Sequence, residues 1–177
     1  MPHQRRPPPP LNAAALERLA LRYVERFATT RGKLAVYLSR KVRERGWEGD
    51  PVDPVAIAER FAELGYVNDR IYAESKASAM ARRGLGARRV SDALRHAGVR
   101  EQDAEAVAPQ LAERANETAL AFARKRRIGP FAETEPDRDK IAKQVAAMVR
   151  AGHSPDLAWK IVRMNPGESV EPFLDGD

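Results

Sequence analysis

The sequence predicts an all-α protein, an elongated and curved array of three tandem three-helix repeats. Composition is the first reason: of the 177 residues, 43% are hydrophobic and only 6% aromatic, and Ala, Leu, Arg and Glu are abundant. A segment of similar pattern also recurs three times at a spacing of roughly 50 residues, which is typical of helical arrays. Finally, a glycine follows each copy, as expected where a helix ends in a left-handed conformation.

The recurring segment is a basic residue followed by apolar residues one and five positions later. The basic residues are Lys33, Arg89 and Lys140. The apolar pairs are Leu34 and Leu38, Val90 and Leu94, and Ile141 and Val145. The glycines that follow are Gly46, Gly98 and Gly152. Because residues four apart share one face of a helix, each segment predicts the buried stripe of a helix.

Further helices are predicted on both sides of each segment. A helix after the glycine is indicated in the first and third copies by an N-cap residue directly followed by proline, at Asp53-Pro54 and Ser154-Pro155. In the middle copy, Asp103 lies near the corresponding place without a proline. Helices before the segments are indicated by the helical spacing of Leu16, Leu19, Tyr23 and Phe27, by the caps Asn68-Asp69, and by Asn116.

The same spacing predicts which side chains form the core. In the first repeat these are Leu34, Tyr37, Leu38, Val42, Ile57, Phe61 and Leu64. In the third repeat they are Ile141, Val145, Met148, Val149, Leu157, Ile161 and Met164. Such stripes are far more often core than a cofactor pocket, so we expect no cofactor.

The predicted organisation is a disordered proline-rich tail at 1–12, repeats at 13–67, 68–113 and 114–170, and a C-terminal tail at 171–177. Each three-helix repeat is too small to bury a full core alone, so stacking on its neighbour is expected to complete it. A single globular bundle of nine helices is the alternative. The tail could also serve as a polyproline docking ligand.

Charge and composition narrow the class of protein. The net charge is +6 and the sequence pI is about 9.9, which suits an anionic partner; because both signs of charge are abundant, a partner protein with an acidic face is the alternative. The chain has no Cys, which excludes disulfides and thiolate zinc sites. No apolar run is long enough for a membrane span, and the N-terminus lacks the apolar region of a signal peptide. We therefore expect a cytoplasmic protein without a membrane partner.

Basic residues are the candidate contact sites. Arg82, Arg83, Arg88 and Arg89 flank Gly84-Leu85-Gly86, and a tight turn there would make a strongly positive corner. Arg124, Lys125, Arg126 and Arg127 form a second run, which would wrap around a helix end and suit a phosphate backbone. The other candidates are Arg31, Lys33, Arg40 and Lys41. A solvated basic surface is the alternative for all of them.

No catalytic or metal site is expected. His3, His96 and His153 are scattered without metal-ligand spacing. Carboxylates such as Asp69, Glu74 and Asp92 are better explained as caps and helix-surface charges than as an acid–base pair. The glycines around Leu85 match no phosphate-binding loop.

The stretch from Leu64 to Val99 resembles the signature of the RecX family. It includes Leu64-Gly65-Tyr66-Val67-Asn68-Asp69 and Arg82-Arg83-Gly84-Leu85-Gly86-Ala87-Arg88-Arg89-Val90. The resemblance extends to Arg26-Phe27, Thr30-Arg31, Tyr37-Leu38-Ser39-Arg40-Lys41 and Gly46. The third repeat resembles the family only in its pattern.

The resemblance implies a right-curved modular protein of three-helix repeats. It also implies binding in the groove of the RecA–DNA filament and down-regulation of recombinase and ATPase activity, without catalysis and as a monomer. The alternative is a stand-alone DNA-binding module of helix-turn-helix-like units, with single- or double-stranded DNA as partner. The scarcity of aromatic residues argues against a binder that stacks bases. A small nuclease or hydrolase is a third class, but this sequence lacks the carboxylate–metal or nucleophile–base constellation that such an enzyme needs.

Overall fold

The computed structural model describes residues 9–174, and every regular element in that part of the chain is helical. The predicted all-α class is therefore confirmed. The chain divides into two compact units. Unit 1 holds the described residues up to Tyr72 together with Ala97–Val99, and unit 2 holds Ala73–His96 and the described residues from Arg100 onward.

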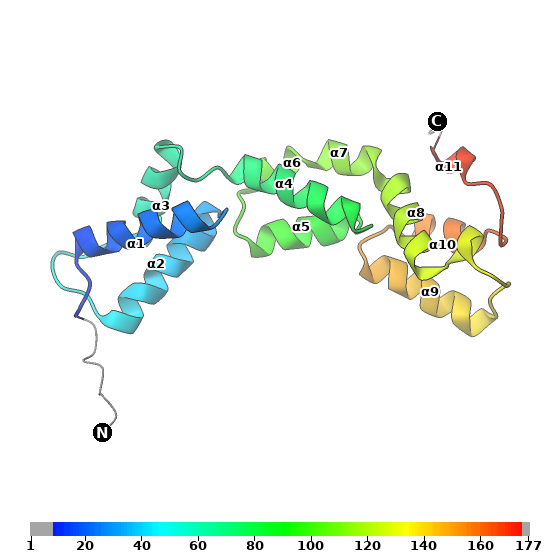
Figure 1. Cartoon of the computed structure of the whole chain (residues 1–177), viewed down its shortest axis with the longest axis horizontal. Helices are drawn as coiled ribbons and strands as arrows, with labels where there is room; N and C mark the ends of the chain where they lie inside the picture. Colours follow the sequence, from blue (N-terminus) through cyan, green and yellow to red (C-terminus); the bar gives the residue numbers. More distant parts are fainter. Residues whose placement is uncertain (1–8, 175–177) are drawn as a thin grey trace, which may run out of the picture. The chain divides into compact units, whose positions relative to one another are not determined.

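Unit 1 is built around three helices, which Figure 1 shows toward the N-terminus. They are α1 (Ala13–Arg26), α2 (Arg31–Arg45) and α3 (Pro54–Glu63). The helix α4 (Asp69–Arg82) begins in this unit. Leu16, Leu34, Leu38 and Phe61 are buried in one apolar cluster contributed by all three helices. The sequence spacing of these residues explains the cluster, because it places them on the inner face of each helix.

Side-chain caps fix where the helices of unit 1 begin. Asn12, Thr30 and Asp53 accept hydrogen bonds from backbone amides in the first turns of α1, α2 and α3. Such caps satisfy donors that have no partner within the helix. The prediction of a cap at Asp53 followed by Pro54 is confirmed.

Unit 2 contains the remaining elements. They are α5 (Ala87–His96), α6 (Glu101–Glu105), α7 (Ala108–Glu113), α8 (Ala115–Arg126), the 3₁₀ helix η1 (Gly129–Phe131), α9 (Arg138–Arg150), α10 (Pro155–Val162) and α11 (Glu171–Leu174). In Figure 1, α8, α9, α10 and α11 gather toward the C-terminus. Their apolar cluster includes Leu120, Phe122, Val145, Met148 and Ile161.

The recurring segments form corresponding helices. Lys33, Arg89 and Lys140 lie near the starts of α2, α5 and α9. The apolar residue five positions after each basic residue is buried, at Leu38, Leu94 and Val145. The position next to the basic residue is buried in α2 and α5, whereas Ile141 of α9 is half-buried. The third copy thus departs from the pattern in structure as it does in sequence.

Three local expectations differ from the structure. Leu64 was predicted in the core but is 63% exposed, because α3 ends at Glu63 and Leu64 lies in the turn that follows. Asn116 does not open α8, which begins at Ala115; its side-chain amide donates instead to the Phe173 carbonyl at 2.9 Å. Asp103 lies inside α6, whose N-cap position is Arg100.

Described residues of both segments expected to be tails pack against the units. Residues 1–8 and 175–177 lie outside the described part. Leu11 is fully buried, and its backbone amide donates to the Gly46 carbonyl at 2.9 Å. At the other end, α11 packs Phe173 against the apolar cluster of unit 2. The boundaries of the three repeats remain a prediction.

Candidate partner-binding site

Four exposed arginines of unit 2, which we call the central arginine cluster, flank one tight turn. Arg82 ends α4, Arg83 begins the turn, and Arg88 and Arg89 lie in the first turn of α5. Backbone amides of Gly84 and Leu85 donate to the last carbonyls of α4, which closes the turn within four residues. The turn therefore connects the end of α4 to the start of α5, and the four arginines flank it along the chain.

Gly84 is required because the turn packs directly on another backbone. Its φ of 77° belongs to the left-handed region, and a Cβ there would lie 2.8 Å from the Phe122 amide nitrogen of α8. The ring of His153 also contacts this turn, with Nε2 3.0 Å from the Gly84 carbonyl oxygen. The turn is thus held between α8 on one side and His153 on the other.

The second basic run, Arg124 to Arg127, lies beside the central arginine cluster. Lys125 Nζ donates to the Arg82 carbonyl at 3.3 Å, so a cation from α8 satisfies the C-terminal end of α4. Arg124 lies over the Phe131 ring, and Arg126 lies over the Phe122 ring. Arg127 pairs with Glu133 at 2.8 Å. This run therefore adds exposed positive charge next to the turn, although Arg127 is partly neutralised.

The start of α5 is joined to the end of α9 through main-chain hydrogen bonds. The Gly86 amide donates to the Ala151 carbonyl at 2.9 Å, and the Arg88 amide donates to the Gly152 carbonyl at 3.2 Å. Two amides at the start of α5 are thereby satisfied by the C-terminal turn of α9, where carbonyls have no helical partner. This junction fixes the main chain from which Arg88 and Arg89 extend.

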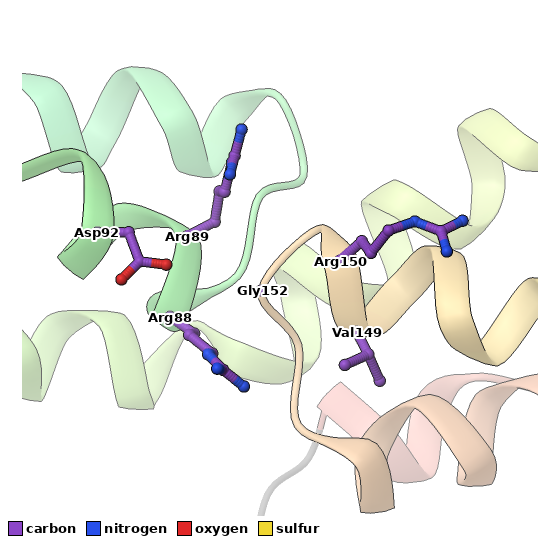
Figure 2. A pocket seen from close by; sticks show the side chains of 6 residues that line it. All are labelled: Arg88, Arg89, Asp92, Val149, Arg150 and Gly152. Atoms are coloured by element: carbon purple, nitrogen blue, oxygen red, sulfur yellow. The ribbon is translucent and has the colours of Figure 1, made fainter.

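A cavity of about 270 Å³ lies at this junction, and we call it the α5–α9 cavity. It is lined by Arg88, Arg89, Asp92, Val149, Arg150 and Gly152. Figure 2 shows Arg88 and Arg89 projecting in opposite directions from α5, whereas Arg150 extends away from them along α9. Asp92 is already paired with Arg95 at 3.0 Å. The rim of the cavity is therefore strongly positive.

The basic candidates of α2 are engaged within unit 1. Lys33 Nζ donates to the Tyr72 hydroxyl at 2.6 Å and lies 4.8 Å from the ring centroid. Arg31 Nε lies 3.9 Å from a carboxylate oxygen of Glu59, and the Arg31 amide donates to Asp69 at 2.9 Å.

Arg40 and Lys41 both pair with Glu44, at 3.6 Å and 2.7 Å. The Lys41 hydrogen bond is the main cause that lowers the pKa of Glu44.

The two sets of basic residues therefore differ in their availability. Arg31, Lys33, Arg40 and Lys41 each have a side-chain partner in unit 1. Within residues 9–174, no carboxylate pairs with the side chains of the central arginine cluster. Unpaired, exposed guanidinium groups are free to bind carboxylates or phosphates of a partner. This comparison favours unit 2 as the site.

Two residues of the site were not found from the sequence. Arg150 adds a third guanidinium to the α5–α9 cavity. His153 is buried, and burial lowers its pKa more than the hydrogen bond with Gly84 raises it. One signal was present: Ala151-Gly152 repeats the dipeptide Ala97-Gly98 after the preceding basic segment, and Arg150 and His153 flank that repeat.

Other kinds of site are not evident in the described chain. No group of three His, Asp or Glu side chains in residues 9–174 is placed to hold a metal ion. In the same part of the chain, no helix combines the length and apolar character that crossing a membrane requires.

The fold and the exposed arginines define an all-helical protein with a basic surface on unit 2. The chain is 34% identical over 163 residues to the regulatory protein RecX of Myxococcus xanthus, covering 85% of this chain and 86% of that protein. The chain therefore belongs to the RecX family of regulatory proteins. RecX of Agrobacterium fabrum is 28% identical, with 88% of this chain and 86% of that protein covered. No protein-family model matches the chain.

Solved structures support the fold independently. The crystal structure of RecX from Lactobacillus salivarius matches with a TM-score of 0.58, covering 85% of this chain and 94% of that chain at 21% identity. A second crystal structure, of a regulatory protein RecX, matches with the same TM-score and identity; the match covers 85% of this chain and 72% of the chain in that structure. The helical fold predicted from the repeats is thus shared with RecX structures.

Proposed function

We propose that this protein binds in the groove of the RecA–DNA filament and lowers the recombinase and ATPase activity of RecA, without itself catalysing a reaction. The observation that carries the proposal is the exposed central arginine cluster, whose side chains pair with no carboxylate in the described chain. Membership of a family of regulatory proteins supports a regulatory role.

The geometry of unit 2 suits contact with an acidic partner surface. Guanidinium groups bind carboxylates and phosphates through paired hydrogen bonds, and several such contacts reinforce one another once the first has formed. The second basic run enlarges the surface, because Lys125 is held against the end of α4. A protein occupying the groove in this way would exclude a second DNA strand and restrain neighbouring RecA protomers.

Charge reversal tests the proposal. Changing Arg82, Arg83, Arg88 and Arg89 to Glu is expected to abolish inhibition of RecA ATPase on single-stranded DNA, because like charges then oppose docking. A matched control changes four exposed arginines of unit 1 to Glu: Arg18, Arg22, Arg26 and Arg43. Both variants alter the net charge equally, so only the position of the charge differs. Circular dichroism establishes that each variant remains helical.

Three possible outcomes separate the proposal from its alternative. Loss of inhibition in the unit 2 variant alone supports docking through the central arginine cluster. Equal inhibition by both folded variants would remove this cluster from the mechanism. Tight and steeply salt-dependent DNA binding by the unchanged protein, with no effect on RecA, would instead favour a stand-alone DNA-binding module.

A further inference from the structure

We propose that a second cavity of unit 2 binds a peptide segment of the partner protein in which an Asp or Glu stands beside a large apolar side chain. The apolar side chain enters the cavity, and Arg88 binds the carboxylate. The proposal rests on the proposed function, because it gives the chemistry of the partner surface that unit 2 contacts. It assigns this contact to protein rather than to nucleic acid.

The cavity, which we call the α5–α10 cavity, lies where three helices of unit 2 begin. Its volume is about 340 Å³, and it is lined by residues at the starts of α5, α8 and α10. The lining includes Ala87, Ala115, Pro155 and Leu157, and Arg88 is the one Asp, Glu, Lys or Arg in it. The cavity is therefore an apolar hollow with a single cation.

The main chain around the cavity is held by hydrogen bonds within unit 2. The Gly86 amide donates to the Ala151 carbonyl, and the Arg88 amide donates to the Gly152 carbonyl. The side chain of Ser154 caps α10 by accepting from the Leu157 amide at 3.3 Å. Because these contacts fix the starts of α5 and α10, a partner segment meets a cavity that is already formed, which lowers the entropic cost of binding.

The charge in the α5–α10 cavity is complementary to one carboxylate. No carboxylate lines the cavity, and within residues 9–174 Arg88 forms no ion pair. Figure 2 shows that Arg88 projects away from Arg89, so the two guanidinium groups do not converge on one anion. A single Asp or Glu side chain can therefore satisfy Arg88 through paired hydrogen bonds.

The apolar lining distinguishes a peptide from a nucleic-acid strand. A large apolar side chain gains free energy by leaving water for the surface of Ala115, Pro155 and Leu157, whereas a sugar-phosphate backbone carries no such group. No Phe, Tyr or Trp lines the cavity for a base to stack on. The volume lies near the lower end of the range for small-ligand sites, which suits one large side chain.

The test is an NMR titration of the isotopically labelled full chain, without RecA, with the capped hexapeptide Gly-Ser-Asp-Phe-Ser-Gly. The amide signals of Gly86 and Leu157 should shift saturably. Arg88→Gln is expected to weaken binding by about tenfold, because it removes a hydrogen-bonded charge pair. The matched variant is Arg89→Gln, which removes the same charge from the neighbouring position on the opposite side of α5 (Figure 2) and should retain most of the peptide affinity.

Two further arms test the two halves of the ligand. A peptide with Asn in place of Asp should bind the natural chain as weakly as the original peptide binds Arg88→Gln. Ala87→Trp should block the cavity and abolish binding, whereas Ser91→Trp, at an exposed position of α5 outside the lining, should not. Circular dichroism establishes that each variant remains helical.

The results separate this proposal from diffuse attraction and from nucleic-acid binding. Equal losses for Arg88→Gln and Arg89→Gln, or unchanged affinity in folded Ala87→Trp, would overturn the site. Displacement of the peptide by oligo(dT), with shifts of the same amides, would assign the cavity to nucleic acid instead. Because RecA is absent, failure here leaves the ATPase prediction untouched. Conversely, a chain that binds the peptide as described without inhibiting RecA would refute the proposed function alone.

Discussion

Gly86 lies so close to Gly152 that a Cβ atom added to Gly86 would come within 2.4 Å of the Gly152 carbonyl carbon. A similar approach occurs in unit 1, where a Cβ on Gly32 would lie 2.8 Å from the Gly98 Cα. In both cases the start of a helix that begins with a basic segment meets an Ala-Gly pair, Ala151-Gly152 or Ala97-Gly98. The recurrence supports an equivalent junction at two points of the chain.

Substitution of Gly86 by Ala tests whether close main-chain packing holds the junction of unit 2. Gly86 does not have a positive φ, so the new methyl group acts through its overlap with Gly152 and His153. We expect a loss of about 3 kcal/mol in the free energy of unfolding, measured by urea denaturation, because the backbone must move apart.

Gly65→Ala is the matched control. Gly65 has a φ of 81° and no atom within 4 Å of an added Cβ, so only conformational strain is introduced. The expected loss is about 1 kcal/mol. Equal losses for the two variants would contradict a role for close packing at Gly86.

Thr30 adds a side-chain hydrogen bond next to the close approach of Gly32 and Gly98 in unit 1. It is fully buried, donates to the Ala97 carbonyl, and accepts from the Lys33 amide at 3.1 Å. Thr30→Val keeps the shape but leaves both partners without a hydrogen bond, so we expect a loss of about 2–4 kcal/mol in unfolding free energy. Thr30→Ser is expected to retain most of the stability. A Val variant as stable as the Ser variant would show that neither hydrogen bond matters.

His153 gives the stability of unit 2 a dependence on pH. Burial holds its pKa below the ordinary value of 6.5, so the unfolded chain binds the proton more readily than the folded one. The stability contributed by neutral His153 is complete above about pH 6.5 and is lost as the pH falls toward the lowered pKa. Thermal unfolding followed at about pH 7 and about pH 5 should show a larger decrease for the natural chain than for His153→Gln. An identical decrease in both would contradict this assignment.

The pairing of Lys33 with Tyr72 predicts a structural role for a basic candidate. A double-mutant cycle with Lys33→Met and Tyr72→Phe should give a coupling of about 0.5–1 kcal/mol, since the side chains share a 2.6 Å hydrogen bond and a cation–π contact. The measurement is unfolding free energy in urea. Additive single effects would mean that Lys33 is not engaged by Tyr72 and remains available to a partner.

Local patterns predicted much of the helical structure. The apolar pairs Leu34 and Leu38, and Val90 and Leu94, are buried because helical spacing directly determines which face they share. Asp53 and Ser154 cap α3 and α10 because capping depends on residues two to three positions away. Leu64 was misplaced because the spacing continued through a position where the helix had already ended.

The candidate site depended on contacts that the sequence does not encode locally. Lys33 and Tyr72 are separated by 39 positions, and His153 and Gly84 by 69. Whether a basic side chain is paired internally or left exposed follows from such distant contacts. The sequence therefore identified the basic residues, whereas the structure distinguishes the paired set in α2 from the exposed arginines of unit 2 and adds Arg150.

Co-sedimentation with RecA filaments formed on single-stranded DNA tests the central claim most directly. The natural chain should sediment with the filaments, and the variant with Glu at positions 82, 83, 88 and 89 should stay in the supernatant. The unit 1 control, with Glu at positions 18, 22, 26 and 43, should sediment like the natural chain. Equal sedimentation of all three proteins, or sedimentation with bare DNA to the same extent as with filaments, would contradict binding to the RecA filament through the central arginine cluster.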